Sequence, residues 1–353
     1  MEIHFHAYKI KYDYLDTYFQ VINKGTPLKH INIFINLDDF FHKLHHPLIN
    51  KEFLTIGQKA PRQLVSNILN LIGHYRHYVI RRLNCSVSVY AIYTSSFSPF
   101  KNAIYIKDYR EKFKEKNLST SEDYAIINQT LSDSYGVMKS IAQYIPGVYI
   151  IDSFYIEPSV IPFYLSNTKK ADWNVIISRD KYDLQYATKE KWVYISPKGD
   201  NSTIISGEHV WDYIAKKESI IGKEHYNYPT NMLPLVLSVV GDKYRNIPRL
   251  RRLGWKTLYS FMEQIMKEYG EYDDITKLTR LLDLLRDQRS LENKRYLNNF
   301  NCVDLNLQTN AMLEIDRLSI DNQLIDRYDT DALKEANRRI FIPFPLRLEF
   351  LLY

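Results

Sequence analysis

Short apolar segments alternate with segments of helical periodicity along much of this 353-residue chain. Apolar residues that recur every three to four positions predict a helix at 62–83. Apolar or β-branched runs predict strands at 30–37, 86–94, 147–152, 173–180 and 191–197. Strands separated by helices favour an α/β fold with a mostly parallel central sheet flanked by helices.

A mainly helical region is expected to follow the strands. Helical periodicity predicts further helices at 101–117, 121–143, 208–217, 230–240, 255–269, 273–288 and 330–339. We therefore divide the chain into an N-terminal extension (1–29), an α/β domain (30–225), a helical region (226–337) and an apolar C-terminal tail (338–353). No internal repeat or low-complexity linker interrupts this order.

Composition narrows the class of protein. A hydrophobic fraction of 45% and a net charge of +6 are typical of a globular protein, and they permit nucleic-acid binding without requiring it. No run of eighteen apolar residues suggests a membrane span, and the N-terminus lacks the apolar core of a signal peptide. With only Cys85 and Cys302, no disulfide framework is expected. We expect a cytoplasmic protein with no membrane partner.

One strongly basic motif is VVGDKYRNIPRLRRLGWKT, at 239–257. One acid, Asp242, is followed by six basic residues: Lys243, Arg245, Arg249, Arg251, Arg252 and Lys256. Arginine binds phosphate through two parallel hydrogen bonds, so this stretch suits the backbone of DNA or RNA. The alternative interpretation is a basic loop that faces solvent or another protein.

Four motifs in order resemble the 5′–3′ exonuclease and flap endonuclease family, a branch of the PIN-like nucleases that includes phage RNase H enzymes. They are FYIEPSVIPFYL (154–165), VIISRDKYDLQYA (175–187), the basic stretch at 239–257 and FNCVDLNL (300–307). The resemblance covers about 30 to 310. It implies a PIN-like nuclease domain followed by a DNA-binding region of the helix-hairpin-helix type, and it suggests a phage source.

The resemblance implies cleavage of phosphodiesters by two divalent metal ions that carboxylates hold. Matched to the family motifs, this chain keeps three acids, Glu157, Asp180 and Asp242. Other acidic positions of the family are replaced here by Asn36, Thr94, Ser159, Val160, Tyr182 and Arg245. The resemblance therefore implies one weakly held Mg or Mn ion at Glu157, Asp180 and Asp242, helped by Asp38, or no metal at all.

Arg245 is the most informative replacement, because a guanidinium keeps its charge and repels a metal ion. We expect it to occupy the vacated cation position and to pair with Asp242 or Asp180. The leading hypothesis is thus a catalytically impaired pseudoenzyme that acts as a nucleic-acid-binding or assembly component. One alternative is an active metal-dependent 5′ nuclease in which Asp38, Asp39 and Asp183 act instead. Another is a structural subunit of a virion or complex.

Two further segments are candidates for binding. The segment 101–117 takes the place of the family's single-strand-gripping arch, with Lys107, Arg110 and Lys112 as backbone contacts and Tyr105 and Tyr109 available for base stacking; an ordinary charged helix is the alternative. The apolar tail from Ile340 to Tyr353 is expected either to pack on the protein's own core or to dock into a protein partner.

Overall fold

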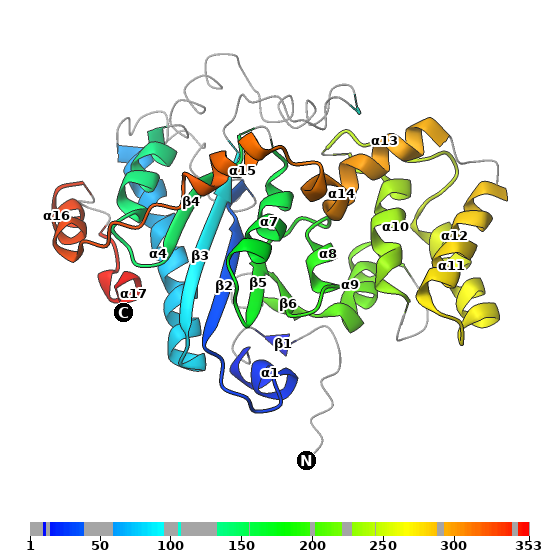
Figure 1. Cartoon of the computed structure of the whole chain (residues 1–353), viewed down its shortest axis with the longest axis horizontal. Helices are drawn as coiled ribbons and strands as arrows, with labels where there is room; N and C mark the ends of the chain where they lie inside the picture. The colour runs from blue at the N-terminus through cyan, green and yellow to red at the C-terminus, as the bar shows by residue number, and fades with distance from the viewer. Residues whose placement is uncertain are drawn as a thin grey trace. The chain divides into compact units, whose positions relative to one another are not determined.

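The computed structural model divides into two compact units, each described by itself below (Figure 1). The sheet unit comprises Asp13–Pro99, Leu118–Arg179 and Met312–Tyr353, and the helical unit comprises Met1–Tyr12, Phe100–Asn117 and Asp180–Ala311. The structure describes residues 10–11, 15–38, 59–94, 105–106, 133–154, 156–197, 202–220, 228–243, 245–287, 293–340 and 345–352. The units reflect packing, and the domain boundaries given above stay a prediction.

Parallel strands form the centre of the sheet unit. They pair in the order β5–β2–β3–β4, every pair parallel, where β2 is His30–Asn36, β3 Ser86–Tyr93, β4 Val148–Asp152 and β5 Trp173–Ile177. Strand β2 is buried from Ile31 to Asn36, as expected of a strand covered on both faces. All four strands lie where the apolar runs predicted them.

Helices cover this sheet. Helix α4 (Lys59–Leu83) connects β2 to β3 and packs against β3, and helix α7 (Ile161–Thr168) follows a short 3₁₀ turn, η3 (Pro158–Val160). Helix α1 (Leu15–Ile22) buries Leu15 and Phe19 completely or nearly so, and the Phe19 ring lies 5.6 Å from the Trp173 ring. Part of the predicted N-terminal extension therefore belongs to the core of this unit.

The described part of the apolar tail packs on α4. Helix α17 (Leu348–Leu351) buries Leu351 against Gly73, where an added Cβ would lie 2.7 Å from Leu351 Cδ2. The Arg347 N–H also donates to Asn70 Oδ1 at 2.7 Å. Residues 345–352 thus follow the own-core interpretation of the tail, whereas 341–344 and Tyr353 lie outside the described residues. Helices α15 (Glu314–Asp321) and α16 (Thr330–Ile340) precede this segment.

The helical unit has a small antiparallel sheet and a series of helices, most of which follow it in the chain. Strand β7 (Thr203–Ile205) pairs with β6 (Trp192–Ser196) and with β1 (Ile10–Lys11). The helices are α8 (Leu184–Ala187), α9 (Val210–Lys217), α10 (Leu233–Val240), α11 (Trp255–Tyr269), α12 (Asp274–Asp287), α13 (Asn293–Val303) and α14 (Leu305–Asn310). Short 3₁₀ turns, η4 (Gly207–His209) and η5 (Thr230–Met232), precede α9 and α10. The predicted fold class, α/β with a mostly parallel sheet and then a helical region, is confirmed.

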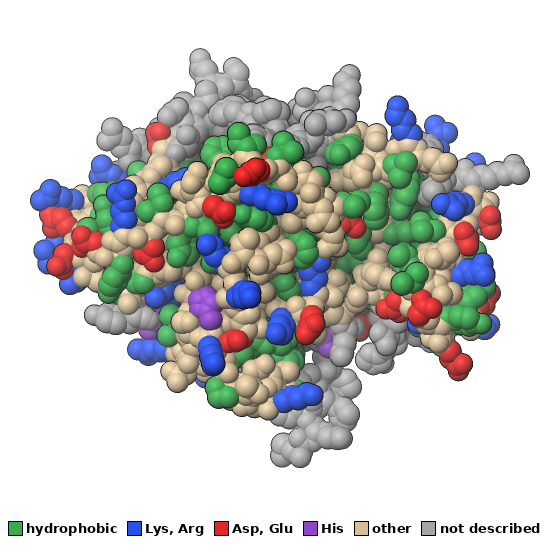
Figure 2. Space-filling view, in the orientation of Figure 1, with side chains coloured by type: hydrophobic (Ala, Val, Ile, Leu, Met, Phe, Trp, Pro, Cys, Tyr) green, Lys and Arg blue, Asp and Glu red, His purple; other side chains and the backbone are tan. Residues whose placement is uncertain are grey.

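Apolar residues determine which helices of this unit are central. Helix α10 is almost wholly apolar and buries Leu233, Val236 and Val239, whereas α12 leaves Ile275 exposed. Figure 2 shows hydrophobic side chains gathered where Figure 1 places α10, α11 and α12. Among the described residues, no helix is both long and apolar enough to cross a membrane.

Candidate functional site

The first part of the site is the turn that follows β5 in sequence, at residues 180–183. Asp180 Oδ1 accepts a hydrogen bond from the Tyr182 N–H at 2.9 Å, and the Asp180 carbonyl accepts one from the Tyr194 hydroxyl at 3.3 Å. Asp183 is fully buried at the start of α8. These hydrogen bonds hold Asp180 just before the N-terminus of the short helix α8.

The second part is the connection between α10 and α11, at residues 241–254. Gly241 ends α10 with φ 66° and ψ −174°, a conformation that only glycine adopts readily. Asp242 and Ile247 then form an isolated bridge, with both backbone hydrogen bonds at 2.8 Å. From α13, Asn299 Nδ2 donates to the Ser238 and Pro248 carbonyls at 2.8 and 2.7 Å. These contacts hold Asp242 and its following turn in place.

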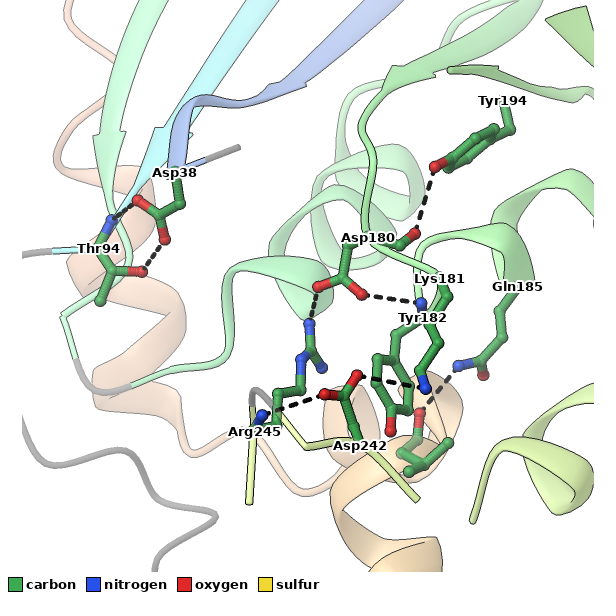
Figure 3. Close-up of polar contacts among 10 residues, drawn as sticks. Asp38, Thr94, Asp180, Lys181, Tyr182, Gln185, Tyr194, Asp242 and Arg245 are labelled. Carbon is green, nitrogen blue, oxygen red and sulfur yellow. Dashed lines mark hydrogen bonds and ion pairs between the residues drawn. The ribbon is translucent and has the colours of Figure 1, made fainter. Parts of the chain in front are cut away.

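The two parts are joined by a network of two cations and two carboxylates around one aromatic ring (Figure 3). The Arg245 guanidinium pairs with Asp180 Oδ2, and its Cζ lies 4.2 Å from the centroid of the Tyr182 ring. The Arg245 N–H donates to Asp242 Oδ1 at 3.2 Å. Lys181 Nζ lies 3.5 Å from Asp242 Oδ2 and donates to the Gly241 carbonyl at 2.9 Å.

This geometry decides between the two partners expected for Arg245. Its guanidinium pairs with Asp180, and its backbone amide donates a hydrogen bond to Asp242. The Arg245 side chain is 4% exposed, so the charge is enclosed by its neighbours. The sequence-based expectation that Arg245 pairs with one of these acids is confirmed.

The donor set of this network does not fit a divalent metal ion. Such ions are held by oxygen ligands that include at least one or two carboxylates, with water or substrate oxygens completing the shell. Here one oxygen of Asp180 holds a guanidinium and one oxygen of Asp242 faces an ammonium, and both cations would repel an ion between them. Across the described residues, no group of three or more His, Cys, Asp or Glu side chains is placed to hold a metal.

The remaining candidate acids lie in the sheet unit. Asp38 accepts hydrogen bonds from the Thr94 N–H at 3.0 Å and from the Thr94 hydroxyl at 2.7 Å, so it fixes the end of β3 (Figure 3). Glu157 is 3% exposed and precedes η3. Burial, helped by nearby carboxylates, holds the pKa of Tyr135 well above its usual value, so its hydroxyl stays neutral. Asp39 lies outside the described residues.

The basic residues between positions 242 and 256 divide into one buried and five exposed side chains. Arg245 is enclosed, whereas the exposed group is Lys243, Arg249, Arg251, Arg252 and Lys256. The α11 N-terminus has Gly254 as its cap, with no side-chain capping hydrogen bond and no acid in the first turn. An Arg249 guanidinium nitrogen lies 3.8 Å from the point where a Cβ on Gly254 would be. Positive charge therefore gathers at a helix start with free N–H groups.

The proposed arch contacts cannot be placed in the same way. Lys107, Arg110 and Lys112, with Tyr109, lie outside the described residues. Tyr105 is described and is 40% exposed, and its carbonyl accepts a hydrogen bond from Asn298 Nδ2 at 2.9 Å. The role of this segment stays a prediction.

Three solved structures of bacteriophage T5 proteins match the backbone of this chain. They are the T5 protein crystallised with metal ions (TM-score 0.51, 16% identity), the T5 flap endonuclease as a pseudo-enzyme–product complex with DNA and metal ions (0.53, 12%) and the T5 5′-exonuclease with bound zinc (0.53, 15%). Each match covers 86% of this chain and 98% of the other. This chain has the flap endonuclease fold.

The likeness is one of structure and not of sequence. No protein-family model matches the chain, and no curated protein matches it significantly in sequence. The predicted resemblance to the flap endonuclease family is thus confirmed at the level of the fold. The activity of the T5 protein is not transferred to this chain by a match at this identity.

Sequence reasoning missed one cation of the network and the residue that shapes its second loop. Lys181 lies within the Asp-Lys segment, but charge alone did not indicate that it faces Asp242. Gly241 precedes Asp242. The positive φ of Gly241 orients its own carbonyl, which accepts a hydrogen bond from Lys181. The adjacent residues Gly241 and Asp242, directly after an apolar run, were the sequence signal that could have indicated this turn.

Proposed function

We propose that this flap endonuclease-fold protein binds the backbone of DNA or RNA and does not hydrolyse it. The observation that supports the loss of hydrolysis most directly is the enclosed Arg245 guanidinium, paired with Asp180 and stacked on Tyr182. A fixed cation at that place stabilises the loops as a metal ion would. It provides no water molecule activated for attack on phosphorus.

Support for nucleic-acid binding comes from the exposed basic residues beside the start of α11. The free N–H groups and dipole of a helix start favour phosphate, and Arg249 adds a guanidinium next to Gly254. The T5 flap endonuclease has been solved in complex with DNA, and it shares this fold. On the face shown in Figure 2, acidic and basic side chains are interspersed, so this face has no broad basic surface.

The backbone at Arg252 provides independent support. Arg252 has φ 61°, in the left-handed region that costs a non-glycine residue about 1–2 kcal/mol. Glycine would adopt this conformation without that cost. An exposed arginine held in an unfavourable conformation is consistent with a side chain retained for binding.

Replacing both Arg249 and Arg252 with alanine should flatten the salt dependence of nucleic-acid binding. Each phosphate contact with duplex DNA contributes about −0.9 to the slope of log K against log salt, so the double variant should lose up to about 1.8 from the slope. Fluorescence anisotropy with a labelled duplex, at several salt concentrations, measures this slope. An unchanged slope would remove both residues from the interface.

Two variants control for charge and for folding. Lys267→Ala removes one exposed charge from the last turn of the same helix, α11, and should leave the slope unchanged. Arg252→Gly removes the side chain together with its backbone strain, so it should weaken binding while keeping or raising the melting temperature. A variant that binds less but unfolds later cannot owe its weaker binding to misfolding.

Incubation with Mg²⁺ or Mn²⁺ should release no nucleotides from a 5′-flap DNA or an RNA–DNA hybrid above the level of a protein-free control. The physical reason is that Arg245 and Lys181 already neutralise the carboxylates that a metal ion needs. Denaturing gel electrophoresis of end-labelled substrate checks this result. Metal-dependent release that disappears in Asp180→Ala would show an active nuclease and overturn the proposal.

A further inference from the structure

On the outer edge of β4 in the sheet unit, one buried backbone position has no hydrogen-bond partner among the described residues. In a parallel pair, successive residues of a strand direct their N–H and C=O groups alternately to opposite sides. The Gly147 carbonyl accepts from the Val89 N–H at 2.7 Å, and the Ser153 N–H donates to the Tyr93 carbonyl at 2.8 Å. The backbone N–H and C=O groups at the alternate positions therefore point away from β3; these positions are Val148, Ile150 and Asp152.

At Asp152, a carboxamide completes this edge. Gln323 Oε1 accepts from the Asp152 N–H at 2.9 Å, and Gln323 Nε2 donates to the Asp152 carbonyl at 3.0 Å. One primary amide thus satisfies both backbone groups of one edge residue, as a neighbouring strand would. Lys139 Nζ donates to the same Gln323 oxygen at 2.8 Å and helps to orient it.

The next edge residue, Ile150, lacks such a partner. It is 2% exposed, and among the described residues no group accepts from its N–H or donates to its C=O on this side. Buried backbone groups are rarely left unpaired in proteins. A cavity of about 330 Å³ lies against it, lined in part by Val148, Ile150, Gly136, Lys139 and Gln323. The cavity is at the small end of the range for ligand sites.

The contacts on both sides limit what the cavity can accept. Gln323 occupies the edge at Asp152, and the Val148 N–H already donates to the Ile145 carbonyl at 3.2 Å. A whole added strand therefore has no continuous edge to pair with. A single group must both accept from the Ile150 N–H and donate to its C=O.

We propose that this cavity binds a primary carboxamide, such as the side-chain amide of glutamine or asparagine, in the manner in which Gln323 binds Asp152. A primary amide has an N–H on the same side as its oxygen, so it can make both hydrogen bonds. A trans secondary amide directs its N–H and C=O in opposite directions and can make only one. A carboxylate accepts at both oxygens and would face the Ile150 carbonyl with another acceptor.

Nuclear magnetic resonance with acetamide as the probe tests this site on the full chain. Titration should shift the Ile150 amide signal in a saturable way, with N-methylacetamide at least tenfold weaker and acetate without effect. L-Glutamine and a blocked glutamine-containing peptide then separate a free ligand from a side chain of a partner. Equal shifts with all three small probes, or none with acetamide, would overturn the proposal and leave a cavity filled by water only.

A matched pair of variants at the rim of the cavity provides the second test. Gly136 lies in the helix 133–142, and a Cβ added there meets nothing within 4 Å. Gly136→Ala should therefore keep acetamide binding, whereas Gly136→Leu should cover the opening and weaken it at least tenfold. Loss of acetamide binding in both variants, or in neither, would contradict the assigned position of the site. The comparison of the three probes uses the wild-type protein, so it remains a valid test even if the leucine variant does not fold.

Discussion

Replacing Arg245 with methionine should lower the free energy of unfolding by about 3 kcal/mol, the low end of the 3–5 kcal/mol found when one partner of a buried ion pair is removed. The substitution removes the guanidinium from Asp180 and from the face of Tyr182 but keeps the apolar stem. The low end applies because the Asp180 side chain is 15% exposed and water screens part of its charge. Urea unfolding followed by circular dichroism measures the change.

A double-mutant cycle makes this result specific. Arg245→Met combined with Asp180→Asn should cost less than the sum of the two single variants, because the first loss already removes the pair. Lys243→Met removes an exposed charge two positions away and should change stability by less than about 0.5 kcal/mol. If Arg245→Met is as stable as the Lys243 control, the network does not hold the two loops together.

Gly241→Ala is the other substitution with a large expected effect, a loss of about 3 kcal/mol or more in the free energy of unfolding. The conformation of Gly241, φ 66° with ψ −174°, costs other residues about 1–3 kcal/mol. A Cβ would also lie 2.6 Å from the Ile247 carbonyl oxygen and 2.7 Å from the Arg249 nitrogen. Both are backbone atoms, so relief requires the turn itself to move.

Gly254→Ala is the matched control within the same connection. Gly254 has φ −108°, and its added Cβ would have only an Arg249 side-chain nitrogen nearby, at 3.8 Å. We expect a loss of less than about 1 kcal/mol, since glycine and alanine differ modestly at a helix N-cap. Thermal unfolding of the two variants side by side checks the difference. Similar melting temperatures would mean that the turn at Gly241 is more adaptable than its geometry implies.

Arg245→Met and Gly241→Ala affect the same feature, the packing of the 180–183 turn against the 241–247 turn. Arg245 provides the charge that joins them, and Gly241 provides the backbone path that places Asp242 and the carbonyl bound by Lys181. The exposed arginines that we propose for binding lie farther along the same connection. The effects on stability and on binding should therefore be separable. Arg245→Met should mainly lower the free energy of unfolding, and Arg249→Ala should mainly weaken nucleic-acid binding.

The sequence by itself determined the parallel strands, many of the helices and the resemblance in fold, whereas it indicated neither β7 nor the helices α13, α14 and α15. Helix α11 occupies the residues 255–269 that its periodicity predicted, and β2 to β6 lie within one to three residues of the apolar runs. These features depend on neighbours in the chain, and hydrophobic periodicity records such local preferences directly. The resemblance also led to the expectation that Arg245 pairs with Asp180 or Asp242.

Only the tertiary structure decided which groups meet. Asp180 and Arg245 are 65 positions apart, and no local pattern distinguishes Asp180 from Asp242 as the partner. Burial likewise separated Arg245 from the five exposed basic residues around it, and packing placed Lys181 against Asp242 and the tail against α4. The physical reason is that charge and burial are set by the three-dimensional neighbourhood of a side chain, which residues distant in the sequence create.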